Sequence, residues 1–375
     1  MKNFLSNISN IFGGDEGNFL GVDIGSSSIK VVQLKKKGGT AVLETYGELS
    51  LGPYANLEEG RATNLSLKEK GEALANLIKE SNVSAKNCGV AIPSRSSLIF
   101  MMNLPNLSES QLSQIVPTEA RKYIPVPISE VELDWKLIPP KSSSGSDFSD
   151  DYAKNEKTEK LKEVFVVAIH KDTINQQREI ISSANLNLKF LEIEIFSTLR
   201  SVVGQNEMNF AILDMGAGVT KLYIIDGGTV HDSHIINRGS QDITLNIARS
   251  LEISAGEAEE LKKKIGVEGE TDEEKEVSKI VSSNFEYIFA ETNKAILNYQ
   301  KKHNKNIDKL IVTGGGSIIK GLKPFALTRV ETEIKIADPF AKVKTPAFLD
   351  EMLKQIGPEF AVALGVAMRG LNELS

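Results

Sequence analysis

One segment of this sequence occurs twice, and the repetition limits the possible folds more than any other feature. Residues 18–32, NFLGVDIGSSSIKVV, align without a gap with residues 209–223, NFAILDMGAGVTKLY. Three polar or glycine positions coincide: Asp23 with Asp214, Gly25 with Gly216, and Lys30 with Lys221. Each copy is an apolar strand, a tight glycine turn and a second β-rich strand, which is the pattern of a β-hairpin. The sequence therefore predicts two similar lobes, one hairpin in each, that face each other across a cleft.

The composition is that of an ordinary globular protein. The chain has 375 residues, of which 41% are hydrophobic and 25% charged, so it is long enough for two domains or one strongly lobed domain. A net charge of −6 argues against broad nucleic-acid binding, which needs many Lys and Arg side chains on phosphates. With one cysteine, Cys88, and four scattered histidines, neither a disulfide framework nor a thiolate zinc site is expected. We expect a cytoplasmic protein without a signal peptide or a membrane span.

The two hairpin turns have the chemistry of a phosphate site. Backbone N–H groups of a glycine turn converge on an anion, while hydroxyls add donors and lysines add positive charge. The candidate phosphate-binding residues are Gly25, Ser26, Ser27, Ser28 and Lys30 in the first hairpin, and Gly216, Ala217, Gly218, Thr220 and Lys221 in the second. Asp23 and Asp214 repel phosphate directly but can hold a hydrated Mg²⁺ that bridges to it. A single Asp-x-Gly would indicate only a turn, whereas the pair favours a site.

A third glycine cluster follows the apolar strand expected at 310–312. Gly314, Gly315 and Gly316 leave the backbone bare, so a flat or bulky group can lie against it. The segment that follows has a helical pattern, and a helix N-terminus favours an anion nearby. Glycine is common in strand-to-helix turns, so this cluster alone is weak evidence for a binding site. Together with the two hairpin turns it completes one.

The three motifs resemble the phosphate 1, phosphate 2 and adenosine motifs of the actin-like ATPases, the superfamily of actin, Hsp70, MreB and FtsA. The resemblance covers almost the whole chain and implies an α/β, actin-like ATPase fold with duplicated ribonuclease H-like lobes, and ATP and Mg²⁺ as cofactors. The segment SAGEAEELKKKIG, 254–266, resembles the helix by which bacterial relatives contact ribose and adenine. It implies nucleotide contacts for Glu259 and Lys262, although its pattern alone would indicate a solvated helix face.

Within this superfamily the sequence resembles the PilM family of type IV pilus assembly proteins. The segments that carry the resemblance are LGVDIGSSSIKVVQL at 20–34, PTEARKYIPVPISEVELDW at 117–135 and FAVALGVAMRGL at 360–371. The middle segment lies where FtsA-like proteins insert a small α/β subdomain, 1C. The expected elements of this subdomain are strands at 88–104, 130–138 and 163–169, and a helix over 108–124 with a possible kink at Pro117.

This resemblance leads to a map of the whole chain. The expected parts are an N-terminal amphipathic segment, 1–17; subdomain 1A, 18–86 and 170–205; the inserted subdomain 1C, 87–169, with a polar, mobile loop at 139–163; subdomain 2A, 206–250 and 306–360; subdomain 2B, 251–305; and a C-terminal helix, 361–375, packed near 1A. Apolar residues at helical spacing predict lobe helices at 71–81 and 282–303.

Hydrolysis of ATP needs a group that orients or deprotonates water, and the sequence supports this step less well than binding. Similarity to MreB implies a glutamate at the end of the last 1A helix, which places the catalytic candidate at Glu194. Glu192 alternates with it, and one of the two can instead be a structural carboxylate at a helix end or on the surface. We therefore expect a slow ATPase or a protein that holds ATP structurally.

The resemblance implies a scaffold at the inner face of the cytoplasmic membrane. Such a protein captures the short N-terminal tail of a PilN-like membrane protein in a groove between 1A and 1C, and is linked through it to PilO and the assembly motor; self-association is possible. An extended tail can bind by strand addition or in apolar pockets. The expected groove walls are residues 91–105 and the helix with Arg121, Lys122 and Tyr123, whose apolar residues can equally be subdomain core.

Two other functions stay open, an FtsA-like cell-division filament and a sugar or acid kinase of the same superfamily. An FtsA is expected to end in a basic amphipathic helix after a linker, whereas this sequence ends in MRGLNELS. A kinase is expected to have a catalytic aspartate and a substrate pocket after the first hairpin, without a 1C-like insertion. Both alternatives are therefore disfavoured.

Overall fold

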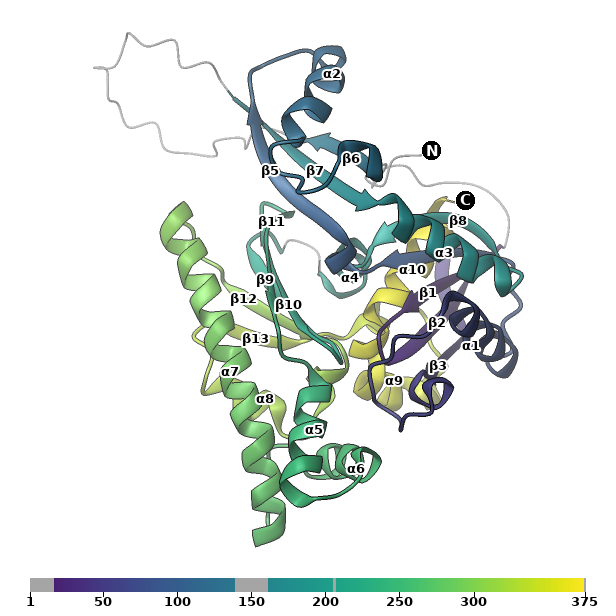
Figure 1. Ribbon diagram of the computed structural model, residues 1–375, viewed down its shortest axis with the longest axis vertical. Helices are drawn as coiled ribbons and strands as arrows, with labels where there is room; N and C mark the ends of the chain where they lie inside the picture. Colours follow the sequence, from purple (N-terminus) through teal and green to yellow (C-terminus); the bar gives the residue numbers. More distant parts are fainter. Residues whose placement is uncertain (1–16, 139–160, 205–206, 374–375) are drawn as a thin grey trace. The chain divides into compact units, whose positions relative to one another are not determined.

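A computed structural model describes residues 17–138, 161–204 and 207–373 of the chain (Figure 1). The expectations for the terminal segment at 1–16 and for the polar loop at 139–160 lie outside the described residues. Two compact units are present: residues 94–174 form one, and the described residues before and after this stretch form the other. Judged by length and hydropathy, none of the helices within the described ranges qualifies as a membrane span.

The larger unit contains two five-stranded sheets with the same strand arrangement. The first, in the order β3-β2-β1-β4-β8, consists of β1 (Asn18–Ile24), β2 (Ser28–Lys37), β3 (Thr40–Ser50), β4 (Asn87–Ile92) and β8 (Asn187–Ile193). The second, in the order β11-β10-β9-β12-β13, consists of β9 (Phe210–Met215), β10 (Thr220–Asp226), β11 (Thr229–Ile236), β12 (Lys309–Thr313) and β13 (Glu333–Ile336). In both sheets three antiparallel strands are followed by two parallel ones. The predicted duplication of the lobes is confirmed.

The first lobe is built on the first sheet and is closed by helices from distant parts of the sequence. They are α1 (Leu67–Glu80), α3 (Lys171–Ser183), α4 (Glu194–Val202), α9 (Asp350–Ile356) and α10 (Ala361–Glu373). The predicted packing of the C-terminal helix near 1A is confirmed, because α10 lies against β1, β2 and β4. The approach is so close that a Cβ at Gly21 would lie 1.9 Å from the Ala363 carbonyl oxygen, and one at Gly365 equally close to that of Ser197.

The expected end of subdomain 2A at residue 360 is wrong. Phe340, Val343 and Phe360 pack in the first-lobe core beside Phe19. Moreover, the Lys344 N–H donates to the Ala41 carbonyl at 2.9 Å. The chain thus returns to the first lobe soon after β13, well before the helix α10.

The second lobe contains the helices α5 (Ser240–Leu251), α6 (Ala255–Ile265), α7 (Asp272–His303) and α8 (Leu322–Leu327). Of these, α7 runs alongside the sheet, while α5 and α6 lie beyond one end of it (Figure 1). The helix predicted at 282–303 is confirmed as α7, which starts earlier because Thr271 forms a capping box with Glu274. Its buried stripe includes Val281, Phe285 and Ile288 at helical spacing, and these residues join the core of this lobe. The helix predicted at 71–81 is confirmed as α1.

The smaller unit is an α/β module with a three-stranded antiparallel sheet in the order β5-β7-β6. Its elements are β5 (Ser97–Leu104), α2 (Glu109–Ala120), β6 (Val131–Leu137) and β7 (Lys162–His170). The predicted single strand at 88–104 is wrong: residues 87–92 form β4, which pairs with β1 and β8 in the first lobe. The helix contains Pro117 as expected but ends at Ala120, so Arg121, Lys122 and Tyr123 follow it rather than belong to it.

Candidate functional site

The two glycine turns have equivalent geometry. The Gly25 N–H donates to the Ser28 carbonyl at 3.0 Å, and the Gly216 N–H donates to the Val219 carbonyl at 3.1 Å. In each hairpin the aspartate and the lysine are cross-strand partners: Asp23 opposes Lys30, and Asp214 opposes Lys221. The sequence repeat therefore reproduces one polar constellation in both lobes.

Asp214, Lys221 and Glu194 form an ion-paired centre that joins the lobes. The Lys221 Nζ lies 2.7 Å from a Glu194 carboxylate oxygen and 3.3 Å from Asp214 Oδ2. Tyr223 adds its hydroxyl at 3.5 Å from Glu194 Oε1. All three charged side chains are at most 13% exposed. Asp23 lies within electrostatic range of all three, so both duplicated aspartates belong to one cluster.

This centre carries negative charge that is only partly neutralised. Burial raises the pKa of Asp23 from 3.8 to about 6; Lys30 opposes the shift, and Glu194 adds to it. Burial also raises the pKa of Asp214, against the opposing effect of Lys221. Among the described residues, none donates a hydrogen bond or forms an ion pair to the Asp23 carboxylate. A cation held near Asp23 would relieve this charge.

The donor set fits Mg²⁺ of the kind that bridges to phosphate. Within the described ranges no group of three or more His, Cys, Asp or Glu side chains forms a ready metal cage. Mg²⁺ usually keeps several waters and is held by one or two carboxylates together with substrate phosphates. Two aspartates beside two glycine turns match that requirement.

The raised pKa of Asp23 leads to a test by substitution. Because the folded protein binds this proton more tightly than the unfolded chain, Asp23 lowers stability as pH rises from about 4 to 6. Asp23→Asn should therefore raise the free energy of unfolding of the nucleotide-free protein at pH 8 by about 1–2 kcal/mol, with a smaller gain at pH 5. Urea unfolding in EDTA at both pH values measures it. An equal effect at both pH values would contradict the assignment.

Lys30 is engaged by carboxylates instead of standing free in the first turn. Its Nζ lies 2.7 Å from Glu48 Oε1 and donates to Ser28 Oγ at 2.7 Å. Glu359, in the 3₁₀ segment Gly357–Phe360, is hydrogen-bonded to Glu48, and burial raises its pKa to about 7. The positive charge of Lys30, which was expected to bind phosphate, is thus partly neutralised by Glu48 and Glu359. Sequence reasoning missed both of these acidic neighbours. Glu48 could have been found as the cross-strand partner of Lys30, whereas Glu359 had no local signal.

The predicted adenosine turn packs directly on the second hairpin. Gly314 has φ +82°, and a Cβ there would lie 2.5 Å from Asp214 Oδ1, so glycine is required. Gly315 is exposed and lies near Glu359, while Gly316 is buried against Met215. The expected helix N-terminus is wrong: a 3₁₀ segment, Gly315–Ile318, follows, and α8 begins only at Leu322.

Glu259 and Lys262 form a buried pair on α6. The Lys262 Nζ contacts Glu259 Oε2 at 2.5 Å and donates to Ser240 Oγ and Thr244 Oγ1 on α5. Lys262 is only 3% exposed, and burial lowers its pKa. The solvated helix face is therefore excluded for these two side chains. They lie close to the second turn, because the Ser240 N–H donates to the Gly216 carbonyl.

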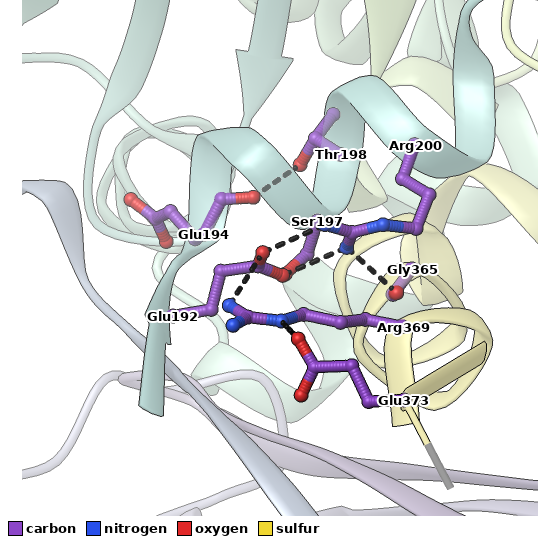
Figure 2. Close-up of polar contacts among 8 residues, drawn as sticks. All are labelled: Glu192, Glu194, Ser197, Thr198, Arg200, Gly365, Arg369 and Glu373. Carbon is purple, nitrogen blue, oxygen red and sulfur yellow. Dashed lines mark hydrogen bonds and ion pairs between the residues drawn. The ribbon is translucent and has the colours of Figure 1, made fainter. Parts of the chain in front are cut away.

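Three expectations about individual side chains need correction. Thr220 is fully buried and donates its hydroxyl to the Arg238 carbonyl, so that hydroxyl is not available as a ligand. Glu194 is the first residue of α4 rather than the end of a helix. Glu192 is 2% exposed and is paired with Arg200 and Arg369, so it is not a surface carboxylate (Figure 2). The other turn residues, Ser26, Ser27, Ala217 and Gly218, keep some exposure.

The smaller unit presents partly exposed apolar groups on an edge strand. In the described part of the chain, β5 pairs only with β7. Leu98 and Phe100 of this strand are half-buried, and Tyr123 is 50% exposed and stacks on Phe100 with 4.8 Å between the ring centroids. The free edge of β5 can accept an extended peptide.

Comparisons with known proteins agree with this architecture. Cell division protein FtsA of Streptococcus pneumoniae serotype 2 (strain D39 / NCTC 7466) is 22% identical over an alignment 418 positions long, gaps included, that covers 96% of this chain and 85% of FtsA. A solved chain of a PilM-PilN type IV pilus biogenesis complex has a TM-score of 0.77 at 23% identity, covering 95% of this chain and 99% of that chain. MreB 5 of Spiroplasma citri bound to AMPPNP has a TM-score of 0.51 at 13% identity, covering 96% and 97%.

These matches confirm the actin-like ATPase fold that the resemblance of the three glycine motifs implied. A family model described as type IV pilus assembly protein PilM matches residues 21–371. The match includes both hairpins, the inserted module and the C-terminal helix. The chain therefore belongs to the PilM family of type IV pilus assembly proteins.

Proposed function

We propose that this protein is an ATP-binding scaffold of the type IV pilus assembly complex that holds the cytoplasmic tail of a PilN-like membrane protein. The observation that carries the nucleotide part is the duplicated centre, in which Asp23 and Asp214 lie in one charged cluster beside two equivalent glycine turns. Membership of the PilM family and the likeness to a PilM-PilN complex support the partner. The likeness to MreB 5 bound to AMPPNP supports a nucleotide.

Different groups of residues would bind the phosphates, the hydrated Mg²⁺ and the nucleoside of Mg·ATP. Amides of the two turns and the hydroxyls of Ser26 and Ser27 would bind phosphate oxygens, while Asp23 and Asp214 would hold the waters of Mg²⁺. Bound Mg²⁺ would neutralise phosphate charge. The bare backbone at 314–316 and the Glu259–Lys262 pair would form the nucleoside side. A ligand that contacts both lobes stabilises their closed arrangement by mass action.

Hydrolysis would be slow in this arrangement. Glu194 is placed between the lobes, where a water-orienting group is needed, but its carboxylate is held by Lys221 at 2.7 Å. A carboxylate held in an ion pair is fixed in place and can accept a hydrogen bond from a water. Because its charge is engaged by Lys221, Glu194 would orient water, which suits a protein that holds ATP structurally.

The tail would bind on the smaller unit. An extended peptide can add to the free edge of β5 and place alternate side chains on the apolar surface of Leu98, Phe100 and Tyr123. Through this tail the protein would act at the inner face of the cytoplasmic membrane, with PilO and the assembly motor as indirect partners.

A peptide-binding experiment tests this proposal. A PilN-type N-terminal tail peptide should bind the purified protein in fluorescence anisotropy, while a scrambled peptide of the same composition should not. Tyr123→Ser should weaken binding about 10-fold, because a half-exposed aromatic anchor is lost. The matched control is Tyr287→Ser, since Tyr287 is 47% exposed on α7 and should leave binding unchanged. Equal binding of native and scrambled peptides would refute the scaffold role.

A further inference from the structure

The loop at 57–66, between the 3₁₀ segment Gly52–Ala55 and α1, connects the lobes at the candidate nucleotide site. From the first lobe, the Thr63 N–H donates to the carbonyl of Ser26 in the first glycine turn at 2.9 Å. The Ala62 N–H donates to Gln241 Oε1 on α5 of the second lobe at 2.5 Å. Gln241 in turn donates its own N–H to the Ala217 carbonyl in the second turn at 2.9 Å. The loop is thus fastened to both predicted phosphate turns.

The loop also touches the predicted nucleoside helix. Gly60 has φ +78°, and a Cβ there would lie 3.1 Å from the Glu259 carboxyl carbon. Near the start of α6, a Cβ on Gly256 would lie 3.4 Å from Glu58 Oε1. The backbone of residue 61 therefore lies between contacts to Glu259 on one side and to Gln241 and Ser26 on the other.

Arg61 is the residue at the centre of these contacts, and within the described ranges its guanidinium forms no hydrogen bond or ion pair to another residue. The Nε atom is buried without a hydrogen-bond acceptor, and no ion pair to Arg61 is found among the described residues. A buried guanidinium N–H without an acceptor costs free energy. Nearby Glu259 accepts from Lys262 and Thr244 at 2.5 Å each, both through Oε2, and no hydrogen bond from Arg61 to it is found.

We propose that Arg61 binds the phosphates of the nucleotide and that the loop at 57–66 covers the site next to the two turns. This inference rests on the proposed function, since it requires that the site binds ATP. A guanidinium matches phosphate oxygens with two parallel hydrogen bonds, which a lysine cannot reproduce. The hydrogen bonds of Ala62 and Thr63 hold the backbone directly after Arg61 in place before the ligand arrives, so little ordering is needed on binding.

The test compares Arg61→Met and Arg61→Lys with the wild-type protein. Calorimetry with Mg·ATP should show affinity reduced about 10- to 100-fold in Arg61→Met, with partial recovery in Arg61→Lys. Without nucleotide, neither variant should melt below wild type, because no hydrogen bond or ion pair of Arg61 within the described ranges is lost. The control Arg249→Met changes an exposed arginine at the end of α5 and should bind ATP as wild type does.

The outcomes separate this inference from the proposed function. If wild-type protein binds no ATP, the proposed function fails and this inference fails with it. If wild type binds ATP and Arg61→Met binds it equally well, only the role of Arg61 is refuted. A loss of nucleotide-free stability that matches the loss of affinity would show that Arg61 is a structural residue and would also overturn the inference.

Discussion

Asp214→Asn should abolish the Mg²⁺-dependent retention of ATP. The substitution keeps the shape of the side chain but removes the charge that would hold the hydrated cation. Affinity for Mg·ATP should fall about 100-fold, while the weaker binding of ATP in EDTA should change little. Lys221 keeps its ion pair to Glu194 at 2.7 Å, so the fold should tolerate the change. Isothermal titration calorimetry with and without Mg²⁺ measures both affinities.

Two further variants make this result specific. Asp232→Asn changes an exposed aspartate on β11 and should bind Mg·ATP as wild type does. Glu194→Gln should retain nucleotide and alter only turnover, because its assigned role concerns water rather than the cation. Unchanged affinity of Asp214→Asn for Mg·ATP would rule out the proposed metal site.

Glu192→Gln should destabilise the protein by about 3–5 kcal/mol, the largest stability effect that we expect from a single polar residue. Glu192 on β8 accepts from Arg200 at 2.7 and 2.8 Å, from Arg369 of α10 at 3.0 Å and from Ser197 at 2.6 Å (Figure 2). Among the described residues, glutamine would leave the partly buried Arg200 without a counter-charge and the buried Arg369 with Glu373 as its remaining carboxylate partner. Equilibrium unfolding in urea measures the loss.

Glu373→Gln provides the matched control within the same network. Glu373 is 39% exposed and, within the part of the chain that is described, forms an ion pair with Arg369 alone, at 2.8 Å, so its loss should cost less than about 1 kcal/mol. Equal costs of the two substitutions would show that burial of the network contributes nothing.

The acid limb of the stability profile should reveal Glu192 as well. Burial opposes ionisation of this carboxyl, but Arg200 and Arg369 outweigh it and lower the pKa below its ordinary 4.5. A lowered pKa contributes stability that is present above about pH 4.5 and is lost as pH falls toward the folded-state value. The wild-type protein should therefore lose this contribution in acid, and the Glu192→Gln variant should show a flatter profile below that pH.

The hairpins were predictable because their information is local. An apolar strand, a glycine corner and a return strand specify a hairpin, and the seven-residue spacing from Asp to Lys sets the cross-strand partners in both copies. The same holds for α1 and α7, whose apolar stripes and capping residues lie in the helices themselves. The predicted start of the inserted module was wrong because 88–104 contains two successive strands with similar apolar patterns, β4 and β5, which belong to different sheets.

The side chains around the site were less predictable because their partners are distant in sequence. Glu359 and Glu48 meet near Lys30, and the loop with Arg61 reaches Gln241, although no short motif connects these positions. Glu192 and Glu194 look alike in sequence, yet one pairs with arginines from α4 and α10 while the other faces Lys221. The packing of helices and lobes around these two positions, rather than any local pattern, decides which partners each carboxylate meets.

By itself, the sequence determined the duplicated lobes and the two glycine turns, because periodicity and turn chemistry act over a few neighbouring residues, while the family was indicated by the resemblance of three segments. Tertiary structure alone decided which charges meet: Glu194 with Lys221 between lobes, Glu192 with the C-terminal helix, and Arg61 beside both turns. The physical reason is that the pKa and the pairing of a buried charge depend on groups brought close by long-range packing, which no local pattern encodes.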